Sequence, residues 1–169
     1  MHRFFIIIIF FISFGCSSST YGPESHEQLT TAEFIKKPFT GEINIEKFRK
    51  ENRNLKYRKY IRTPKSNPSM VDTVYRFFSG KNNILFYKPQ QKDEVFLINL
   101  TVGDKKIRLK NSIKPGLKKE NLHKRLSDFP SAKNDTVRVT HHNKTGTFIF
   151  KANKLEKIMI YPSKGEKNQ

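Results

Sequence analysis

The sequence predicts an α+β fold, in which an antiparallel β-sheet meander carries one or two short helices packed on one face. Between Thr73 and Tyr161, short runs of β-branched and aromatic residues are separated by turn residues such as Gly, Asn and Asp. Such short spacings favour strands that pair with their sequence neighbours in antiparallel fashion. Two other stretches place apolar residues at helical spacing. We therefore expect a single domain over residues 32–162, with its sheet at about residues 73–161.

The first helix is expected at about residues 43–55. Its apolar stripe consists of Ile45, Phe48 and Leu55, with Asn52 in the position where one further apolar residue would lie. The charged residues fall on the remaining faces. This pattern is typical of an amphipathic helix that packs on a sheet.

A second, shorter helix is expected around Leu122. Leu122, Leu126 and Phe129 repeat at offsets of 0, 4 and 7, which places them on one helical face, and Pro130 ends the pattern.

Seven runs are predicted to be strands. Among them, Ile107 and Leu109 alternate with charged residues and face one side, and the last two runs form a hairpin around residues 152–154. The expected strands cover residues 73–78, 84–87, 94–102, 106–109, 136–141, 147–151 and 155–161.

Residues 1–15 are predicted to be an export signal. A basic start at His2 and Arg3 precedes an apolar run that is far shorter than the roughly 20 residues a membrane-spanning helix needs. The run stops at Gly15 and Cys16, and Cys16 is the chain's only cysteine. A single thiol in an exported chain cannot form an internal disulfide and therefore needs another explanation.

The junction at Cys16 resembles the lipobox of bacterial lipoproteins, in the looser form found in Bacteroidetes. Ser13 and Phe14 stand where the usual pattern has Leu and a small residue. The resemblance implies that Cys16 is diacylated on sulfur and becomes the new N-terminus, which would anchor the chain in a membrane. The other interpretation is an ordinary secretory signal followed by an incidental cysteine.

The residues after the cysteine are expected to form a flexible tether, so that residues 16–31 comprise the lipidated cysteine and its linker. No Asp follows Cys16 directly and no acidic cluster follows either. In lipoprotein sorting this composition implies the outer membrane, with the protein facing the periplasm. Residues 163–169 are expected to be a disordered tail.

The chain is strongly basic, with a formal net charge of +18. The export signal argues against nucleic acid as the partner and leaves anionic lipid headgroups, lipopolysaccharide or acidic proteins. The basic residues are densest at residues 47–65, where the candidate contacts to an anionic surface are Arg49, Arg53, Arg58 and Arg62. The alternative is a solvated basic face that reflects an AT-rich genome.

The stretch from Ile113 to Tyr161 resembles a recurrent module of bacterial lipoproteins. The residues that carry the resemblance are an Ile, a Gly-apolar pair, a short helix and a closing hairpin: Ile113, Gly116-Leu117, Leu122, Leu126, Phe148, Phe150, Leu155 and Ile158. The module is similar to the β-lactamase-inhibitor-protein-like fold, which small lipoproteins of the β-barrel assembly machinery share. This resemblance implies binding to proteins more often than catalysis. The upstream strands would be another meander of the same sheet or part of a tandem repeat.

No catalytic, metal or cofactor site is expected. His141 and His142 are adjacent in a predicted strand and should point to opposite faces, and His123 lies beside Lys124 and Arg125. The only thiol is assigned to the lipid, and neither a nucleophile elbow nor a Gly-rich phosphate loop occurs. An enzyme would need acidic or histidine side chains that converge only in the fold.

Two further features concern modification and packing. Asp72-Thr73 and Asp135-Thr136 match an O-glycosylation pattern of exported Bacteroidetes proteins, although Asp-Thr is also a natural strand start. Phe77 and Phe78 should present one ring to each face of the sheet, so at least one ring needs a partner or a covering helix.

These observations predict a lipid-anchored, non-catalytic protein of the cell envelope that binds a protein partner, as an assembly or inhibitor-type scaffold. The alternative is a binder of an anionic glycolipid or polymer through the basic residues.

Overall fold

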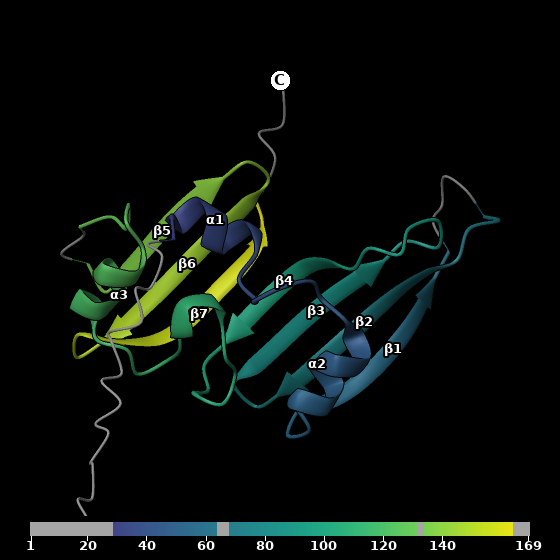
Figure 1. Cartoon of the computed structure of the whole chain (residues 1–169), viewed down its shortest axis with the longest axis horizontal. Coiled ribbons are helices and arrows are strands. Elements are labelled where there is room, and N and C mark those ends of the chain that lie inside the picture. The colour runs from purple at the N-terminus through teal and green to yellow at the C-terminus, as the bar shows by residue number, and fades with distance from the viewer. Residues whose placement is uncertain (1–28, 64–67, 132–133, 164–169) are drawn as a thin grey trace, which may run out of the picture.

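The computed structural model describes residues 29–63, 68–131 and 134–163, so that Cys16, residues 17–28 of the expected tether and residues 164–169 of the expected tail lie outside the described residues. Residues 29–31 belong to the fold and not to the tether, because Leu29 is buried and Thr31 begins the first helix. Within these ranges the chain forms seven strands, three short α-helices and one 3₁₀ turn (Figure 1). The helical elements are α1 (Thr31–Lys36), α2 (Ile45–Glu51), η1 (Lys110–Ser112) and α3 (Lys119–Arg125). The strands are β1 (Lys56–Arg62), β2 (Asp72–Ser79), β3 (Asn82–Lys88), β4 (Phe96–Val102), β5 (Thr136–His141), β6 (Lys144–Lys151) and β7 (Lys154–Pro162).

All seven strands belong to one antiparallel sheet with the order β1-β2-β3-β4-β7-β6-β5. The α+β class with an antiparallel sheet is confirmed, but a simple meander is only partly correct. Strands β1–β4 form one meander and β5–β7 form another, and the two meet at β4 and β7. After β4 the chain passes through η1 and α3 to the far edge, where β5 begins.

One face of the sheet holds the core. The pairing register places one residue from each strand in a row that crosses the whole sheet: Tyr57, Phe77, Ile84, Leu100, Ile160, Gly146 and Val139. Residues paired in this way share a face. Phe77, Ile84, Leu100 and Ile160 are 0% exposed, because all three helices lie on this side of the sheet (Figure 1).

Helix α2 covers the β1–β4 half through Phe48. Its ring lies 4.9 Å from that of Phe77 and 5.1 Å from that of Phe86. The helix ends at Glu51, earlier than the expected residue 55. Leu55 is buried as the stripe predicts, but in the turn that leads into β1.

Helix α1 covers β5 and β6, and the sequence pattern does not predict it. A capping box begins the helix: the Thr30 hydroxyl accepts from the Glu33 amide at 3.1 Å, and the Glu33 carboxylate accepts from the Thr30 amide at 2.9 Å. Phe34 and Ile35 are 0% exposed. Six residues are too few to display helical periodicity, and the apolar pair was overlooked beside the polar linker.

Helix α3 lies where Leu122 and Leu126 predict it, and both residues are 0% exposed. It ends at Arg125, while Phe129 continues into a loop where its ring lies 5.0 Å from that of Phe148. Lys118 occupies the N-cap position and provides no side-chain hydrogen bond there.

Two strand predictions need correction. Residues 106–109 do not pair with any described strand. Ile107 and Leu109 are buried in a turn and the irregular segment after it, so their alternation reflects burial of one side and not membership of the sheet. Strand β1 was not predicted, because charged residues occupy both of its faces. Lysine and arginine are common on such edge strands, where they oppose pairing with another chain.

Within the described ranges, no helix is both long enough and apolar enough to cross a membrane.

Candidate binding surface on the uncovered face of the sheet

The second face of the sheet carries no helix among the described residues. A second row again takes one residue from each strand: Lys56, Phe78, Asn83, Thr101, Met159, Thr147 and Arg138. Two further rows cross β1–β4, namely Arg58, Arg76, Leu85 and Asn99, and then Tyr60, Val74, Tyr87 and Phe96. A shorter row crosses the other meander through Tyr161, Thr145 and Thr140. These four rows together define what we call the open face.

Arginine and aromatic side chains stack in the β1–β3 part of the open face. The guanidinium of Arg58 lies 5.4 Å from the ring centre of Phe78, and that of Arg76 lies 4.8 Å from it. Arg76 also donates from Nε to Oδ1 of Asn83 at 2.8 Å. Hydrogen bonding, chiefly to Arg58, lowers the pKa of Tyr60. The region therefore offers aromatic rings together with oriented hydrogen-bond donors.

Hydroxyl groups dominate the β5–β7 part of the open face. Thr147 and Tyr161 share a hydrogen bond at 3.1 Å, as do Thr140 and Thr145. Thr147 is only 1% exposed although no described helix lies over it. This half is polar and well packed, and it continues the surface without a charged barrier.

A hollow of about 400 Å³ lies on the open face where the β2–β3 turn meets β4 and β7. Its cations are Arg76, Lys81 and Lys157, and its one carboxylate is Glu156. The other lining residues are Phe78, Ser79, Gly80, Asn82, Asn83, Thr101 and Gly103. The hollow can accept an anionic or polar group that protrudes from a partner.

The cations of the open face have no carboxylate partners. Among the described residues only two ion pairs occur, Lys47–Glu51 at 4.0 Å and Lys88–Asp93 at 3.3 Å. Arg58, Arg76 and Lys157 take part in neither. Their charges therefore remain available to an acidic ligand.

The structure separates the four candidate arginines. Arg58 and Arg62 alternate on β1 and lie on the side of the open face. Arg49 lies on α2, where its guanidinium is 4.8 Å from the Tyr57 ring centre, so it belongs to the covered face. Arg53 lies in the turn after α2. Within residues 47–63 the four candidates thus do not form one basic face.

The two threonines of the glycosylation pattern differ in accessibility. Thr136 is exposed at the start of β5, whereas Thr73 is partly buried in β2. Asp72 has a structural role, since it accepts hydrogen bonds from the Tyr87 hydroxyl and from the Gln90 amide, the latter at 3.2 Å. Thr136 is the more accessible acceptor, and the intact mass of the mature protein tests its modification.

The two adjacent histidines do not point to opposite faces. Their ring centres are 4.1 Å apart, because His142 leaves the strand and enters the β5–β6 turn with φ = 50°. The premise drawn from strand geometry was therefore wrong. Across residues 29–63, 68–131 and 134–163, no group of three or more His, Cys, Asp or Glu side chains gathers.

One packing prediction that bears on this surface is confirmed: Phe77 is buried under α2, and Phe78 lies on the opposite face. Arg76 and Lys157 also belong to this surface, although neither is among the candidates predicted from the sequence. The alternation of Val74, Arg76 and Phe78 in β2 is a sequence signal that could have placed Arg76 on this face. The position of Lys157 depends on the pairing of β4 with β7, which no local sequence pattern reveals.

No protein-family model, no curated protein and no solved structure matches the chain.

Proposed function

We propose that the chain is a lipid-anchored, non-catalytic protein of the cell envelope that binds a protein partner through the open face. Cys16 would fix it to the outer membrane on the periplasmic side, and the residues that follow would give the domain reach. The proposal involves no cofactor, no metal and no nucleic acid.

The observation that carries the proposal is the placement of all three helices on one side of the sheet (Figure 1). The opposite side presents Tyr60, Phe78, Tyr87 and Phe96 beside unpaired arginines. Aromatic residues and arginine are the types most enriched at protein interfaces and among their energetic hot spots. A surface that crosses seven strands also offers room for the roughly 800 Å² per partner that a stable interface buries.

The partner should carry an acidic patch, because the open face holds cations without carboxylate partners. Electrostatic complementarity of this kind accelerates association and excludes wrong partners. An assembly partner or an enzyme to be inhibited would both satisfy this description, in line with the module that the stretch from Ile113 to Tyr161 resembles.

The test compares two adjacent residues of β1. Arg58 lies on the open face, whereas Lys59 pairs with Tyr75 on the covered side, and both are exposed. We expect Arg58→Glu to abolish recovery of a stoichiometric partner from envelope membranes, and Lys59→Glu to retain it. Equal recovery with both variants, or no stoichiometric protein with the unaltered chain, would contradict the proposal.

The membrane anchor has its own test. We expect Cys16→Ser to move the protein from the membrane fraction to the soluble fraction, because the variant has no sulfur to acylate. A variant that remains in the membrane fraction would contradict lipidation as the anchor.

A second candidate function is binding of an anionic glycolipid or polymer. The stacking of Arg58 and Arg76 on Phe78 favours it, since neither arginine forms an ion pair among the described residues. Vesicles that contain lipopolysaccharide but no protein distinguish the two functions. Binding lost with Arg58→Glu and kept with Arg49→Glu, on the covered face, would support the glycolipid; no binding to such vesicles would exclude it.

A further inference from the structure

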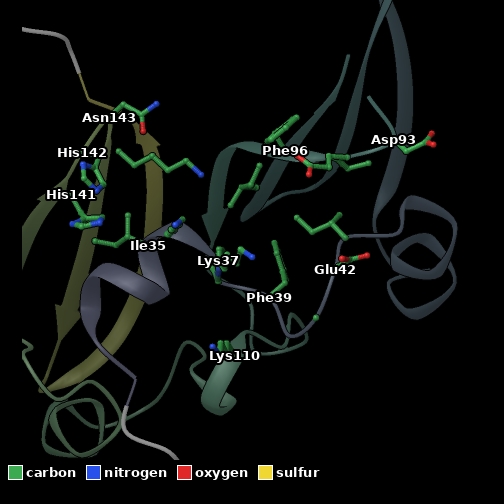
Figure 2. A pocket seen from close by; sticks show the side chains of 18 residues that line it. Ile35, Lys37, Phe39, Glu42, Asp93, Phe96, Lys110, His141, His142 and Asn143 are labelled. Atoms are coloured by element: carbon green, nitrogen blue, oxygen red, sulfur yellow. The ribbon is translucent and has the colours of Figure 1, made fainter. Parts of the chain in front are cut away.

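A groove of about 870 Å³ lies between the start of β4 and the turn that joins β5 to β6, away from the hollow on the open face. Figure 2 shows His141, His142 and Asn143 on one side of it and Phe96 and Asp93 on the other. Lys37 and Phe39, from the connection between α1 and α2, lie between the two walls.

The groove follows the edge of β4. Val95, Phe96 and Leu97 all line it, although consecutive residues of an extended chain point to alternate faces of a sheet. Side chains from both faces meet in one cavity only where the strand's own edge borders that cavity.

That edge of β4 is not paired along its first half. The ladder between β4 and β7 contains three pairs, from Leu100 with Ile160 to Val102 with Ile158. Phe96 and Leu97 pair with β3 on their other side, and no described strand pairs with them toward β7. The backbone groups along a free strand edge are a template for one more strand.

Four lysines and three carboxylates line the groove, together with two histidines. The lysines are Lys36, Lys37, Lys110 and Lys144, and the histidines are His141 and His142. The acidic residues are Glu42, Asp93 and Glu94, of which Asp93 already pairs with Lys88 at 3.3 Å. Lys144 is half-buried, and burial lowers its pKa. Within the described residues it has no ion pair, so a carboxylate in the groove would compensate its desolvation.

We propose that this groove binds an extended, acidic peptide segment of a protein partner, which adds as a strand to the free edge at the start of β4, at Phe96 and Leu97. Backbone hydrogen bonds to β4 supply affinity, and carboxylates opposite Lys144 and Lys37 supply selectivity. Alternate apolar side chains of the segment pack on Phe39 and Val95. The site is distinct from the open face, and it extends the proposed protein binding to a second contact.

The test uses the full chain and an eight-residue fluorescent peptide of alternating Glu and Val. Two control peptides have the same length: one alternates Lys and Val, and one carries N-methyl groups that remove its backbone donors. We expect only the unmodified Glu-Val peptide to raise the fluorescence anisotropy. Binding should also slow hydrogen exchange at the amides of Phe96 and Leu97, which NMR resolves.

Charge-reversal variants inside the groove are the second part of the test. We expect Lys144→Glu, and independently the exposed Lys37→Glu, to weaken peptide binding by about tenfold or more, equivalent to about 1.4 kcal/mol. The matched control is Lys151→Glu, since Lys151 is an exposed lysine at the other end of β6 and outside the groove. Its affinity for the peptide should be unchanged.

Four results would overturn the proposal. Equal binding of the N-methylated peptide would exclude strand addition, and equal binding of the Lys-Val peptide would exclude selection for acidic segments. Full displacement by free glutamate would assign the groove to a small carboxylate, and a dimer that competes with the peptide would assign it to a second copy of the chain. Arg58→Glu should leave peptide binding intact, so loss of the open-face partner and loss of the peptide are separate outcomes.

Discussion

Gly146 in β6 and Ile35 in α1 lie so close that no side chain fits between them. A Cβ atom on Gly146 would lie 2.7 Å from both Cγ1 and Cδ1 of Ile35, closer than real Cβ contacts. Ile35 is 0% exposed and packed on the sheet, so its side chain would have to shift to make room for that atom. Helix α1 therefore rests directly on the backbone of β6, and the glycine sets how closely it approaches.

We expect Gly146→Ala to destabilise the fold by about 1–3 kcal/mol, the usual cost of overpacking a core. Urea unfolding followed by circular dichroism measures this cost. Gly80→Ala is the control, because a Cβ on Gly80 would meet nothing within 4 Å. Ile35→Ala should cost less in the Gly146→Ala background than alone, and strict additivity of the two changes would contradict the contact.

Phe48 is expected to be the main attachment of α2. Its ring packs against those of Phe39, Phe77 and Phe86 at centroid distances of 5.3, 4.9 and 5.1 Å. Phe48→Ala should cost about 3–5 kcal/mol in the free energy of unfolding, because it leaves a cavity among three rings. Lys47→Ala, one position earlier, removes only an exposed ion pair at 4.0 Å and should change stability by less than about 0.5 kcal/mol. Similar costs for both variants would contradict this assignment.

The sequence predicts those elements in which periodicity and burial coincide. Phe48 in α2 and Leu122 in α3 repeat at helical spacing and are buried against the sheet, so their helices were found. In α1 the helix is a single capped segment, and its burial depends on Gly146, more than 100 residues later in the chain. Local pattern carries no information about such a distant contact.

The residues of the open face can likewise be predicted only in part from the local sequence. Phe78 could be placed opposite Phe77 from strand alternation alone, and the structure confirms it. The neighbours of Phe78, in contrast, follow from the pairing of β1 with β2, and β1 was not predicted. Likewise the groove exists because the β4–β7 ladder stops at Leu100, which depends on strand order and not on composition.

Asp128 should make the docking of α1 sensitive to acid. Its carboxylate accepts from the Thr31 amide at the start of α1. Burial raises the pKa of Asp128, but hydrogen bonding from Thr31, chiefly from its amide, outweighs it and leaves the pKa below its ordinary value. The stabilisation is therefore present at neutral pH and is lost as the pH falls through the lowered pKa.

We expect Asp128→Ala to cost about 1 kcal/mol at pH 7, as the loss of a helix cap does, and to increase hydrogen exchange at the α1 amides. The difference from the unaltered chain should shrink as the pH falls through the lowered pKa of Asp128, where its carboxylate becomes protonated. Asp135→Ala, at an exposed carboxylate before β5, is the control and should have little effect at either pH. A cost that stays constant down to the lowest pH would contradict the assignment.

Lys144 is expected to lower stability, which suits a residue retained for binding. Burial lowers the pKa of Lys144, so the folded state disfavours its charged form. The penalty is full below the lowered pKa, declines as the pH rises through it and vanishes above the ordinary pKa of a lysine. We expect Lys144→Met to stabilise the chain at pH 7 by a few tenths to about 1 kcal/mol, because the side chain is only half-buried. The gain should shrink at pH 10, and Lys151→Met at an exposed position should give none.

The same Lys144→Met variant should bind the Glu-Val peptide more weakly, since it removes the cation that faces the groove. A variant that is less stable at pH 7 would show that Lys144 has an unrecognised structural role, whereas greater stability with weaker binding is the trade-off expected of a binding residue.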